Sequence, residues 1–324
     1  MRIPAPAPAP AASDLRKADL YNPSHVTRRF LLASLLALGA PFRAAASAAP
    51  RSRKILRLKT GAVEEVDLEA YVAAVVPPEI GHAPAAALEA QAVAARSYAL
   101  ARGERHLEDG ADLCDGTHCQ VFHGLSAATE DSRRAAAATA GLVLTQKGRV
   151  IAAPFHAVCG GRTARPRDVW DDEETPDLES VEDGACLAAP GATWSFTIPR
   201  VVLSALSGSL GFGGARFFEV YGHDASGRVS MVRFAAPGGA SRVVRGFEFR
   251  RVASELWGWD SVRSTDFTLE ETRPSYLLSG RGTGHGAGMC QAGAIARAKR
   301  GESRDAILGL YYRGAELIPL DSIG

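Results

Sequence analysis

The sequence lacks the features by which several large classes of protein are recognised. It has no excess of positive charge, with 37 basic and 36 acidic residues among 324, whereas a nucleic-acid binder presents a clustered basic face. It contains no H-E-x-x-H motif, no EF-hand spacing and no G-x-G-x-x-G loop completed by a downstream acid. These absences argue against a nucleic-acid binder, a zinc amidase or peptidase, a calcium-loop protein and a dinucleotide-binding enzyme.

The sequence also has little that could cross a membrane. The apolar run at residues 30–40 is too short for a membrane span, and it follows Arg28-Arg29 and precedes small residues at 44–48. This pattern predicts a secretory signal peptide within residues 1–46, and the arginine pair resembles a twin-arginine signal. Without these residues 31 basic and 34 acidic residues remain, a formal charge of −3. We therefore expect an exported protein, periplasmic or extracellular, with no membrane span in its mature form.

The rest of the chain has the composition of a globular protein, with 46% hydrophobic and 23% charged residues. Helical and strand patterns are mixed along it, which predicts an α+β fold. We expect a core formed by residues 51–190 and 266–322. Residues 191–265 alternate short strand patterns with glycine-rich turns, which predicts an inserted small α+β subdomain.

A single carboxylate stands out in this core. Asp67 can cap a helix whose apolar residues continue to Val76, and Pro77-Pro78 is expected to end it. An alanine-rich second helix is expected at residues 85–99. Glu79 would then lie on a stiff junction among apolar residues, where it is a candidate general acid. The alternative is an ordinary surface glutamate between two helices.

Further elements are expected near the middle and the end of the chain. The patterns predict a helix at about residues 130–139 and a hairpin whose strands, at 142–145 and 150–153, flank a turn with a glycine. A glycine-rich loop at residues 280–288 leads into a helix that begins at Gln291. A last helix is expected at about residues 304–313.

Five cysteines are available for pairing or metal binding. Cys114 and Cys119, together with His106 or His118, resemble a zinc loop with one position left for water or substrate. In an oxidising compartment a Cys114–Cys119 disulfide is equally open. Cys159 and Cys186 flank an acidic loop and are expected to form a stapling disulfide. Cys290 would then be a buried thiol.

Five motifs, in order from about residue 56 to 314, resemble the stage II sporulation protein D family, also called the amidase-enhancer family. They are residues 68–79, residues 87–98, Cys119-Gln120-Val121-Phe122, residues 156–163, and residues 284–294 with the run G-H-G-A-G-M-C-Q-A-G-A. The resemblance implies a lytic transglycosylase that cuts peptidoglycan glycan strands, preferably strands stripped of their peptides. It places the catalytic glutamate on Glu79. It also allows a noncatalytic, glycan-binding enhancer of a partner cell-wall amidase.

One carboxylate suffices for the reaction that the resemblance implies. Ordinary glycosidases need two carboxyl groups. In a lytic transglycosylase the 6-hydroxyl of N-acetylmuramic acid attacks its own C1, so one residue gives a proton and then takes one back. Glu79 would need a pKa near neutrality, and no cofactor is required for the chemistry. Zinc would be structural, as in family members that hold it through one histidine and two cysteines in this segment.

The resemblance also implies supporting residues. His285 and Gln291 become candidates for contacting the sugar or orienting Glu79, with Gln120 and His156 in supporting positions. Arg96 and Tyr98 lie on the second helix. Arg96 could form a surface pair with Glu89, seven residues before it, or could read N-acetyl and hydroxyl groups in the cleft.

Overall fold

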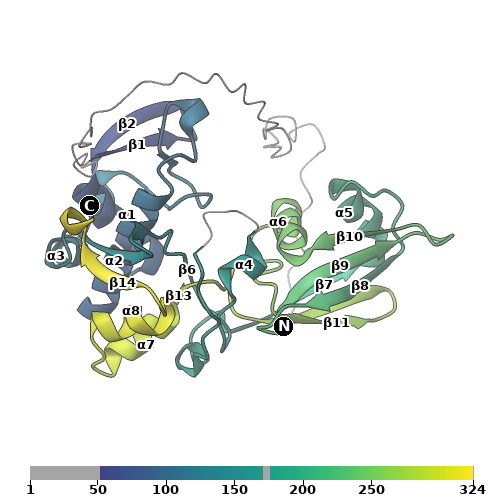
Figure 1. Ribbon diagram of the computed structural model, residues 1–324. Helices are drawn as coiled ribbons and strands as arrows, with labels where there is room; N and C mark the ends of the chain where they lie inside the picture. Colours follow the sequence, from purple (N-terminus) through teal and green to yellow (C-terminus); the bar gives the residue numbers. More distant parts are fainter. Residues whose placement is uncertain (1–51, 171–175, 324) are drawn as a thin grey trace, which may run out of the picture. The chain divides into compact units, whose positions relative to one another are not determined.

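A computed structural model describes residues 52–170 and 176–323 of the chain (Figure 1). The predicted signal peptide, residues 1–46, lies outside the described residues, and it stays a prediction. Among the helices of the described residues, none combines the length and the hydrophobicity that crossing a membrane requires.

The described residues form a mixed α+β fold, as the sequence predicted (Figure 1). The helices are α1 (Leu68–Ile80), α2 (Ala85–Ala101), α3 (Glu130–Ala138), α4 (Pro166–Val169), α5 (Leu203–Ser209), α6 (Gly246–Trp257), α7 (Gln291–Lys299) and α8 (Arg304–Tyr311). The strands are β1 (Ser52–Arg57), β2 (Ala62–Asp67), β3 (Leu113–Cys114), β4 (Leu142–Gln146), β5 (Arg149–Val150), β6 (Phe155–His156), β7 (Thr193–Pro199), β8 (Phe217–His223), β9 (Val229–Ala235), β10 (Ser241–Arg245), β11 (Phe267–Glu271), β12 (Ser275–Arg281), β13 (Met289–Cys290) and β14 (Glu316–Pro319).

The strands form small separate sheets. Their orders are β2-β1-β3, β14-β4-β5, β13-β6, β11-β12-β7 and β10-β9-β8. Two of these sheets join distant parts of the chain: β13 pairs in parallel with β6, and β14 pairs antiparallel with β4. The C-terminal segment is therefore hydrogen-bonded into the part of the fold built by residues 142–156.

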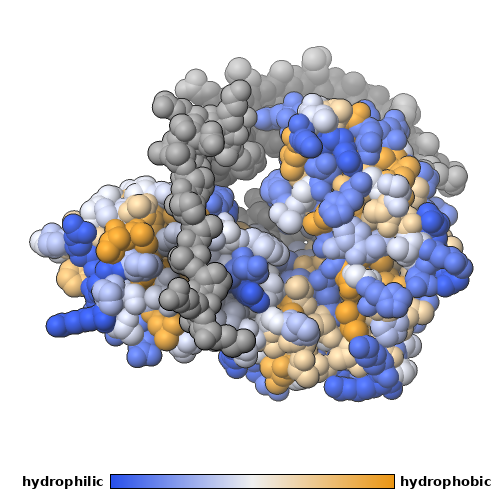
Figure 2. Space-filling model, turned by 180° about the vertical axis from the view of Figure 1, so that it is seen from behind, coloured by the Kyte–Doolittle hydropathy of each residue, from blue (hydrophilic) through white to orange (hydrophobic). Residues whose placement is uncertain are grey.

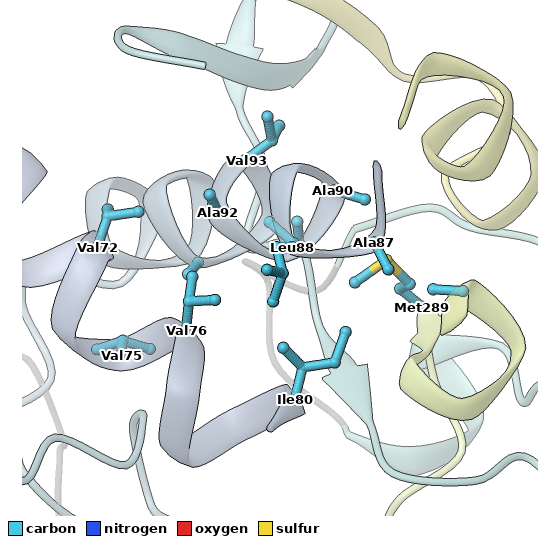
Figure 3. Packing of buried hydrophobic residues seen from close by; sticks show 14 of the residues in the cluster. Val72, Val75, Val76, Ile80, Ala87, Leu88, Ala90, Ala92, Val93 and Met289 are labelled. Atoms are coloured by element: carbon cyan, nitrogen blue, oxygen red, sulfur yellow. The ribbon is translucent and has the colours of Figure 1, made fainter. Parts of the chain in front are cut away.

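The first hydrophobic core is centred on α1 and α2. Both helices bury small residues, so their backbones can pack closely, and Figure 3 shows Val76 and Ile80 of α1 facing Leu88 of α2, with Met289 beside Ala87. This core also includes residues of α3, α7 and α8. The alanine-rich helix is thus central to the fold rather than a surface element.

The predicted hairpin is present as β4 and β5. Its two turn residues, Lys147 and Gly148, both have positive φ, at 52° and 74°. Positive φ at both positions is the requirement of a two-residue type I′ turn, which matches the right-handed twist of the strands. The helices expected at residues 130–139, from Gln291 and at residues 304–313 correspond to α3, α7 and α8.

A second hydrophobic core lies within residues 194–278. It contains a group of aromatic rings, with Phe218 stacked on Phe234 at 5.0 Å between ring centroids and packed against Phe249 at 5.1 Å. Phe267 of β11 and Tyr276 of β12 belong to this same core. The inserted segment was expected to end at residue 265, but β11 and β12 pack with it because both strands extend the sheet that begins at β7.

The surface mixes polar and apolar side chains. In the view of Figure 2, hydrophobic residues reach the surface as separate patches with polar residues between them. Exposed large apolar residues such as Val201, Phe217 and Tyr221 belong to the second core's segment. Scattered apolar residues of this kind are normal on a protein surface.

Arg96 of α2 connects α1, α3 and β4 inside the first core. Its Nε and Nη2 donate to the two carboxylate oxygens of Glu69, at 2.8 and 2.5 Å. Its Nη1 donates to the carbonyl of Leu142 at 3.1 Å, and its Nη2 to that of Ala136 at 3.3 Å. The side chain is fully buried.

The expectations for Arg96 were therefore wrong. Glu89 pairs with Arg304, at 3.8 Å, and not with Arg96. The side chain of Arg96 cannot read a substrate in a cleft either, since its donors are bound to partners within the core. The face of α2 that the sequence pattern left as a surface is covered by α3 and β4.

Replacing this side chain should destabilise the fold. We expect Arg96→Ala to lower the free energy of unfolding by about 3 kcal/mol or more, because buried acceptors lose their donors. The matched control is Arg134→Ala, whose ion pairs with Glu130 and Asp131 are exposed, and which should cost less than about 1 kcal/mol. Urea unfolding measures both, and equal losses would contradict the buried role of Arg96.

Candidate active site

Glu79 lies on the last turn of α1, where it is half-buried. Asp67 caps this helix as expected, because its side chain accepts from the backbone N–H groups of Glu69 and Ala70, each at 3.0 Å. Pro77 and Pro78 do not end the helix, which continues to Ile80 and ends at Gly81 with a positive φ of 70°. The two prolines fall in the last turn, where a helix can lose N–H donors and still be held by packing.

The Glu79 carboxylate has one hydrogen-bond donor among the described residues. Its Oε1 accepts from the backbone N–H of Val121 at 2.7 Å. Burial raises the pKa of Glu79 to about 7, and the bond from Val121 opposes this rise only in part. No basic side chain of the described residues forms an ion pair with it. A carboxyl group with this pKa exists in both protonation states near neutral pH.

Gln120 and Tyr71 hold the loop that supplies this donor. Gln120 is buried, its Oε1 accepts from the Tyr71 hydroxyl at 3.0 Å, and its Nε2 donates to the carbonyl of Ala95 at 3.4 Å. The neighbouring Phe122 packs against the Tyr71 ring at 5.2 Å between centroids. Gln120 therefore lies in a supporting position, where it fixes the loop against α1 and α2.

Tyr98 connects this region to the cysteine loop. Its hydroxyl accepts from Arg105 Nη1 at 2.9 Å, and Arg105 Nη2 lies 2.8 Å from Nε2 of His118. Burial is the largest cause that raises the pKa of Tyr71, and the charges of Cys119, Tyr98 and Glu79 add to it. The structure thus brings Glu79, Tyr98 and the cysteine loop to one place.

Four metal-ligand side chains gather in that loop. The donor atoms of His106, Cys114, His118 and Cys119 all lie within 4.8 Å of one another. The sequence had left His106 and His118 as alternatives, but the structure brings both to the site. Nε2 of His106 lies 3.2 Å from Nδ1 of His118, which is 3.9 Å from Cys114 Sγ and 3.7 Å from Cys119 Sγ.

These distances suit a tetrahedral zinc ion. Bond lengths of about 2.0–2.3 Å imply about 3.3 Å between two nitrogen ligands and about 3.5 Å between nitrogen and sulfur. His106 also donates from Nδ1 to Asp109 at 2.9 Å, and such a bond leaves Nε2 free to face a metal. A hydrogen bond with Cys119 is the largest cause that lowers the pKa of Cys114 to about 3, which favours a thiolate.

His285, in the glycine-rich loop after β12, and His156, on β6, form a second group, with 5.5 Å between their ring centroids. Nε2 of His285 donates to the carbonyl of Phe155 at 2.8 Å, and its Nδ1 accepts from the backbone N–H of Ala287 at 3.1 Å. His156 donates from Nδ1 to the carbonyl of Ala287 at 3.0 Å. Burial lowers the pKa of His156 to about 3 and that of His285 well below its usual range. Both imidazoles are therefore neutral near pH 7.

Neither histidine orients Glu79. Both ring nitrogens of His285 are bound to the backbone, and among the described residues no hydrogen bond or charge interaction connects it to Glu79. The part of the prediction that had His285 orient the acid is wrong, because the tautomer is already set by Phe155 and Ala287. A sugar contact through the ring stays a prediction.

Gln291 is also taken up by the fold. It is the first residue of α7, it is buried, and its Nε2 donates to Oε1 of Gln91 on α2 at 3.3 Å. This bond connects α7 to α2, and a sugar contact through Gln291 stays a prediction. Among the described residues, no hydrogen bond of Gln291 reaches Glu79.

Sequence reasoning missed three residues. Tyr71 was assigned only to an apolar helix face, although its hydroxyl holds Gln120. Arg105 bridges Tyr98 and His118, and no sequence pattern marked it. Trp170 packs against His285 at 4.7 Å between ring centroids; its place in an acidic loop was the only signal.

Comparisons with known proteins agree with this arrangement of motifs. A family model described as "Stage II sporulation protein" matches residues 57–146. Stage II sporulation protein D of Bacillus subtilis (strain 168) is 28% identical over 300 residues, covering 85% of this chain and 81% of that protein. The chain is similar to the stage II sporulation protein D family. The family model spans Glu79, Tyr98 and the cysteine loop, and it ends before His156 and His285.

Two other proteins are also similar to this chain. An uncharacterized protein of Brachyspira hyodysenteriae (strain ATCC 49526 / WA1) is 29% identical over 272 residues, which cover 81% of this chain and 69% of that protein. The "Amidase enhancer" of Bacillus subtilis (strain 168) is 27% identical over 276 residues, or 71% of this chain and 38% of that protein. These similarities support a role related to the cell wall.

The buried carboxyl group should make stability depend on pH. Because the pKa of Glu79 is raised on folding, its contribution is most favourable at low pH and is lost as the pH rises toward and beyond 7. We expect Glu79→Gln to match the wild type near pH 4 and to exceed it by about 2–3 kcal/mol near pH 8.5. Chemical unfolding at the two pH values measures the difference.

The exposed Glu108→Gln is the matched control for that substitution. A direct carbon-13 titration of the Glu79 carboxyl group should show a midpoint near the value of about 7. A midpoint in the range of an ordinary glutamate, at about 4.3, would contradict the environment described for Glu79.

Proposed function

We propose that the chain is an exported peptidoglycan lytic transglycosylase that cleaves the bond between N-acetylmuramic acid and N-acetylglucosamine. It acts on glycan strands, with strands stripped of peptides as the expected substrate, in the periplasm or outside the cell. The observation that carries this proposal is the Glu79 carboxyl group, with one backbone donor and a pKa of about 7. The similarity to this family supports the substrate class.

Glu79 would act twice in the reaction. Protonated Glu79 gives its proton to the glycosidic oxygen as the bond from that oxygen to C1 breaks. The 6-hydroxyl oxygen of the muramic residue then forms a bond to C1, and Glu79 takes the proton of that hydroxyl. The product has a 1,6-anhydro ring, and Glu79 returns to its starting state. A pKa near the working pH suits a group that must both donate and accept.

The proposed scheme needs one carboxyl group, whereas hydrolysis by a glycosidase needs two. Hydrolytic glycosidases place two carboxyl groups about 5–9.5 Å apart. Among the described residues, no second carboxylate acts on the pKa of Glu79. A neighbouring carboxylate would add its own charge effect in such a partly buried place. This supports a mechanism in which the substrate hydroxyl replaces the water and the second carboxylate.

Zinc is proposed as a structural ion in the loop of His106, Cys114, His118 and Cys119. Its role would be to hold this loop in place. Of the two residues that follow the loop, Gln120 is bonded to Tyr71 and Ala95, and Val121 donates to Glu79. His118 would bind through Nδ1, and its Nε2 would then carry a proton. Arg105 Nη2, now 2.8 Å from that Nε2, would have to turn away because both groups are donors.

Removing the proton carrier should abolish cleavage. We expect Glu79→Gln to lower the rate of anhydro-muropeptide release by about 10²-fold or more, while the protein still folds and binds glycan. Mass spectrometry of products from intact and denuded strands measures the release. The anhydro product is lighter than the hydrolysed one by a water molecule. Full release by Glu79→Gln would remove Glu79 from the catalytic role.

The similarity to an "Amidase enhancer" gives a second candidate function, a noncatalytic module that binds glycan and stimulates an amidase. The same experiment separates the two. If the wild type binds strands but releases no anhydro product, and if it raises amidase activity equally with Glu79→Gln, the second candidate is correct. The transglycosylase proposal then fails.

Loss of the loop ligands should remove zinc and weaken catalysis together. We expect Cys114→Ser combined with Cys119→Ser to lose about one zinc per chain by elemental analysis, and cleavage to fall because the Val121 donor is less well held. The control is Cys119→Ser alone, which should weaken zinc binding less than the double change. If the double variant has the same metal content as the wild type, and if peptide maps of the wild type contain a Cys114–Cys119 linkage, the two cysteines form a disulfide instead.

A further inference from the structure

Three sulfur atoms and one carboxylate meet in the interior, away from the loop of His106. Cys159 lies just after β6, Asp183 and Cys186 lie on one short turn, and Cys290 caps the N-terminus of α7. Their ligand atoms all lie within 4.8 Å of one another, and all four residues are buried. We call this group the buried thiolate cluster.

The distances in the buried thiolate cluster are close to those of a tetrahedral metal site. Cys159 Sγ lies 3.3 Å from Cys186 Sγ and 3.7 Å from Oδ2 of Asp183. Zinc bond lengths imply about 3.8 Å between two sulfur ligands and about 3.6 Å between sulfur and oxygen. The sulfurs of Cys159 and Cys186 are not joined, since a disulfide bond is about 2.05 Å long.

Backbone N–H groups surround the sulfurs. Cys290 Sγ accepts from the N–H of Cys159 at 3.2 Å and from that of Gly293 at 3.4 Å. The backbone N–H groups of Gly161 and Gly160 are directed at Cys186. Donors aimed at sulfur stabilise thiolates, the form that binds metal.

The carboxylate has the outer contacts of a metal ligand. Oδ2 of Asp183, which faces Cys159, accepts from the Tyr311 hydroxyl at 2.6 Å, and Oδ1 accepts from Arg297 at 3.2 Å. Ligating carboxylates are usually oriented by such second partners. Gly293 is required here, since a Cβ at that position would lie 2.0 Å from Oδ2 of Asp183.

We propose that Cys159, Asp183, Cys186 and Cys290 bind a structural zinc ion that is separate from the one in the loop of His106. Three thiolates and a carboxylate carry four negative charges. Zinc and Arg297 supply three positive charges, and the N–H donors and the N-terminus of α7 stabilise the remainder. The ion joins the segment around residues 159–186 to α7.

A Cys159–Cys186 disulfide, the expectation from the sequence, accounts for fewer of these contacts. It would give no partner to the sulfur of Cys290, although two backbone N–H groups donate to that sulfur. It would also give the oriented Oδ2 of Asp183 no cation other than Arg297. The third sulfur and the carboxylate are what the sequence could not place, because Cys290 lies 131 residues from Cys159.

Metal content of the full chain tests the proposal. We expect about two zinc ions per chain in the wild type by elemental analysis, and five reactive thiols after denaturation with a chelator. Cys290→Ala should lose about one zinc. The matched control is Met289→Leu, a volume-conserving change at the adjacent buried residue, which should keep both ions.

Two further variants keep the test valid if Cys290→Ala does not fold. Cys114→Ser combined with Cys119→Ser leaves the buried thiolate cluster intact and should retain one zinc. Asp183→Asn keeps the acceptor for Tyr311 and should bind that zinc about tenfold or more weakly in competition with a chelator. Circular dichroism reports whether each variant is folded.

Three results would overturn the proposal. They are a peptide map with Cys159 linked to Cys186, equal zinc in folded Cys290→Ala and Met289→Leu, and no zinc in the folded double serine variant. None of these results bears on glycan cleavage by Glu79, so the two proposals stand or fall separately.

Discussion

The hydrogen bond from the Val121 N–H to Glu79 connects the two elements on which the site depends. Glu79 lies in the last turn of α1, and Val121 belongs to the loop that begins with the cysteines. Burial without this hydrogen bond would raise the pKa of the carboxyl group further. Additional donors would lower the pKa toward that of an ordinary glutamate. One donor in a half-buried place gives a value of about 7. The position of that loop therefore sets the chemistry that Glu79 can perform.

The fold holds this loop from several sides. Tyr71 reaches Gln120 from α1, and the carbonyl of Ala95 receives the same side chain from α2. The two helices can lie close enough for this because α2 is made largely of alanine. Arg96, on the same helix, fastens α2 to α1, α3 and β4. A residue that resembled part of a binding site thus contributes rigidity to the scaffold.

His285 of the glycine-rich loop and His156 of β6 illustrate a different use of polar groups. His285 and His156 are both neutral and both bonded to the backbone around Phe155 and Ala287. Burial makes their charged forms unfavourable, so they do not exchange protons near neutral pH. They shape the loop, and Trp170 covers His285. For Glu79, by contrast, burial raises the pKa to about 7.

The sequence by itself determined the parts that depend on neighbours in the chain. The Asp67 cap, the alanine-rich helix and the Lys147-Gly148 turn are local patterns, and the structure contains each of them. The spacing of Cys114 and Cys119 is also local, and their side chains do lie together. Glu79 was singled out in the same way, from its apolar flanks. The continuation of α1 through Pro77 and Pro78 was missed, since packing against α2 outweighs the local preference of proline.

Only the tertiary structure decided what depends on contacts across the chain. Arg96 became a core residue because α3 and β4 cover it, and Gln291 became a connection between helices because Gln91 lies opposite. The backbone donor to Glu79, Val121, lies 42 residues away in the sequence, and Cys290, the third sulfur beside Cys159 and Cys186, lies 131 residues from Cys159. Sequence periodicity reports which side of a helix or strand is apolar, but it does not report which segment packs there. The pKa of Glu79 and the grouping of the cysteines both follow from that packing.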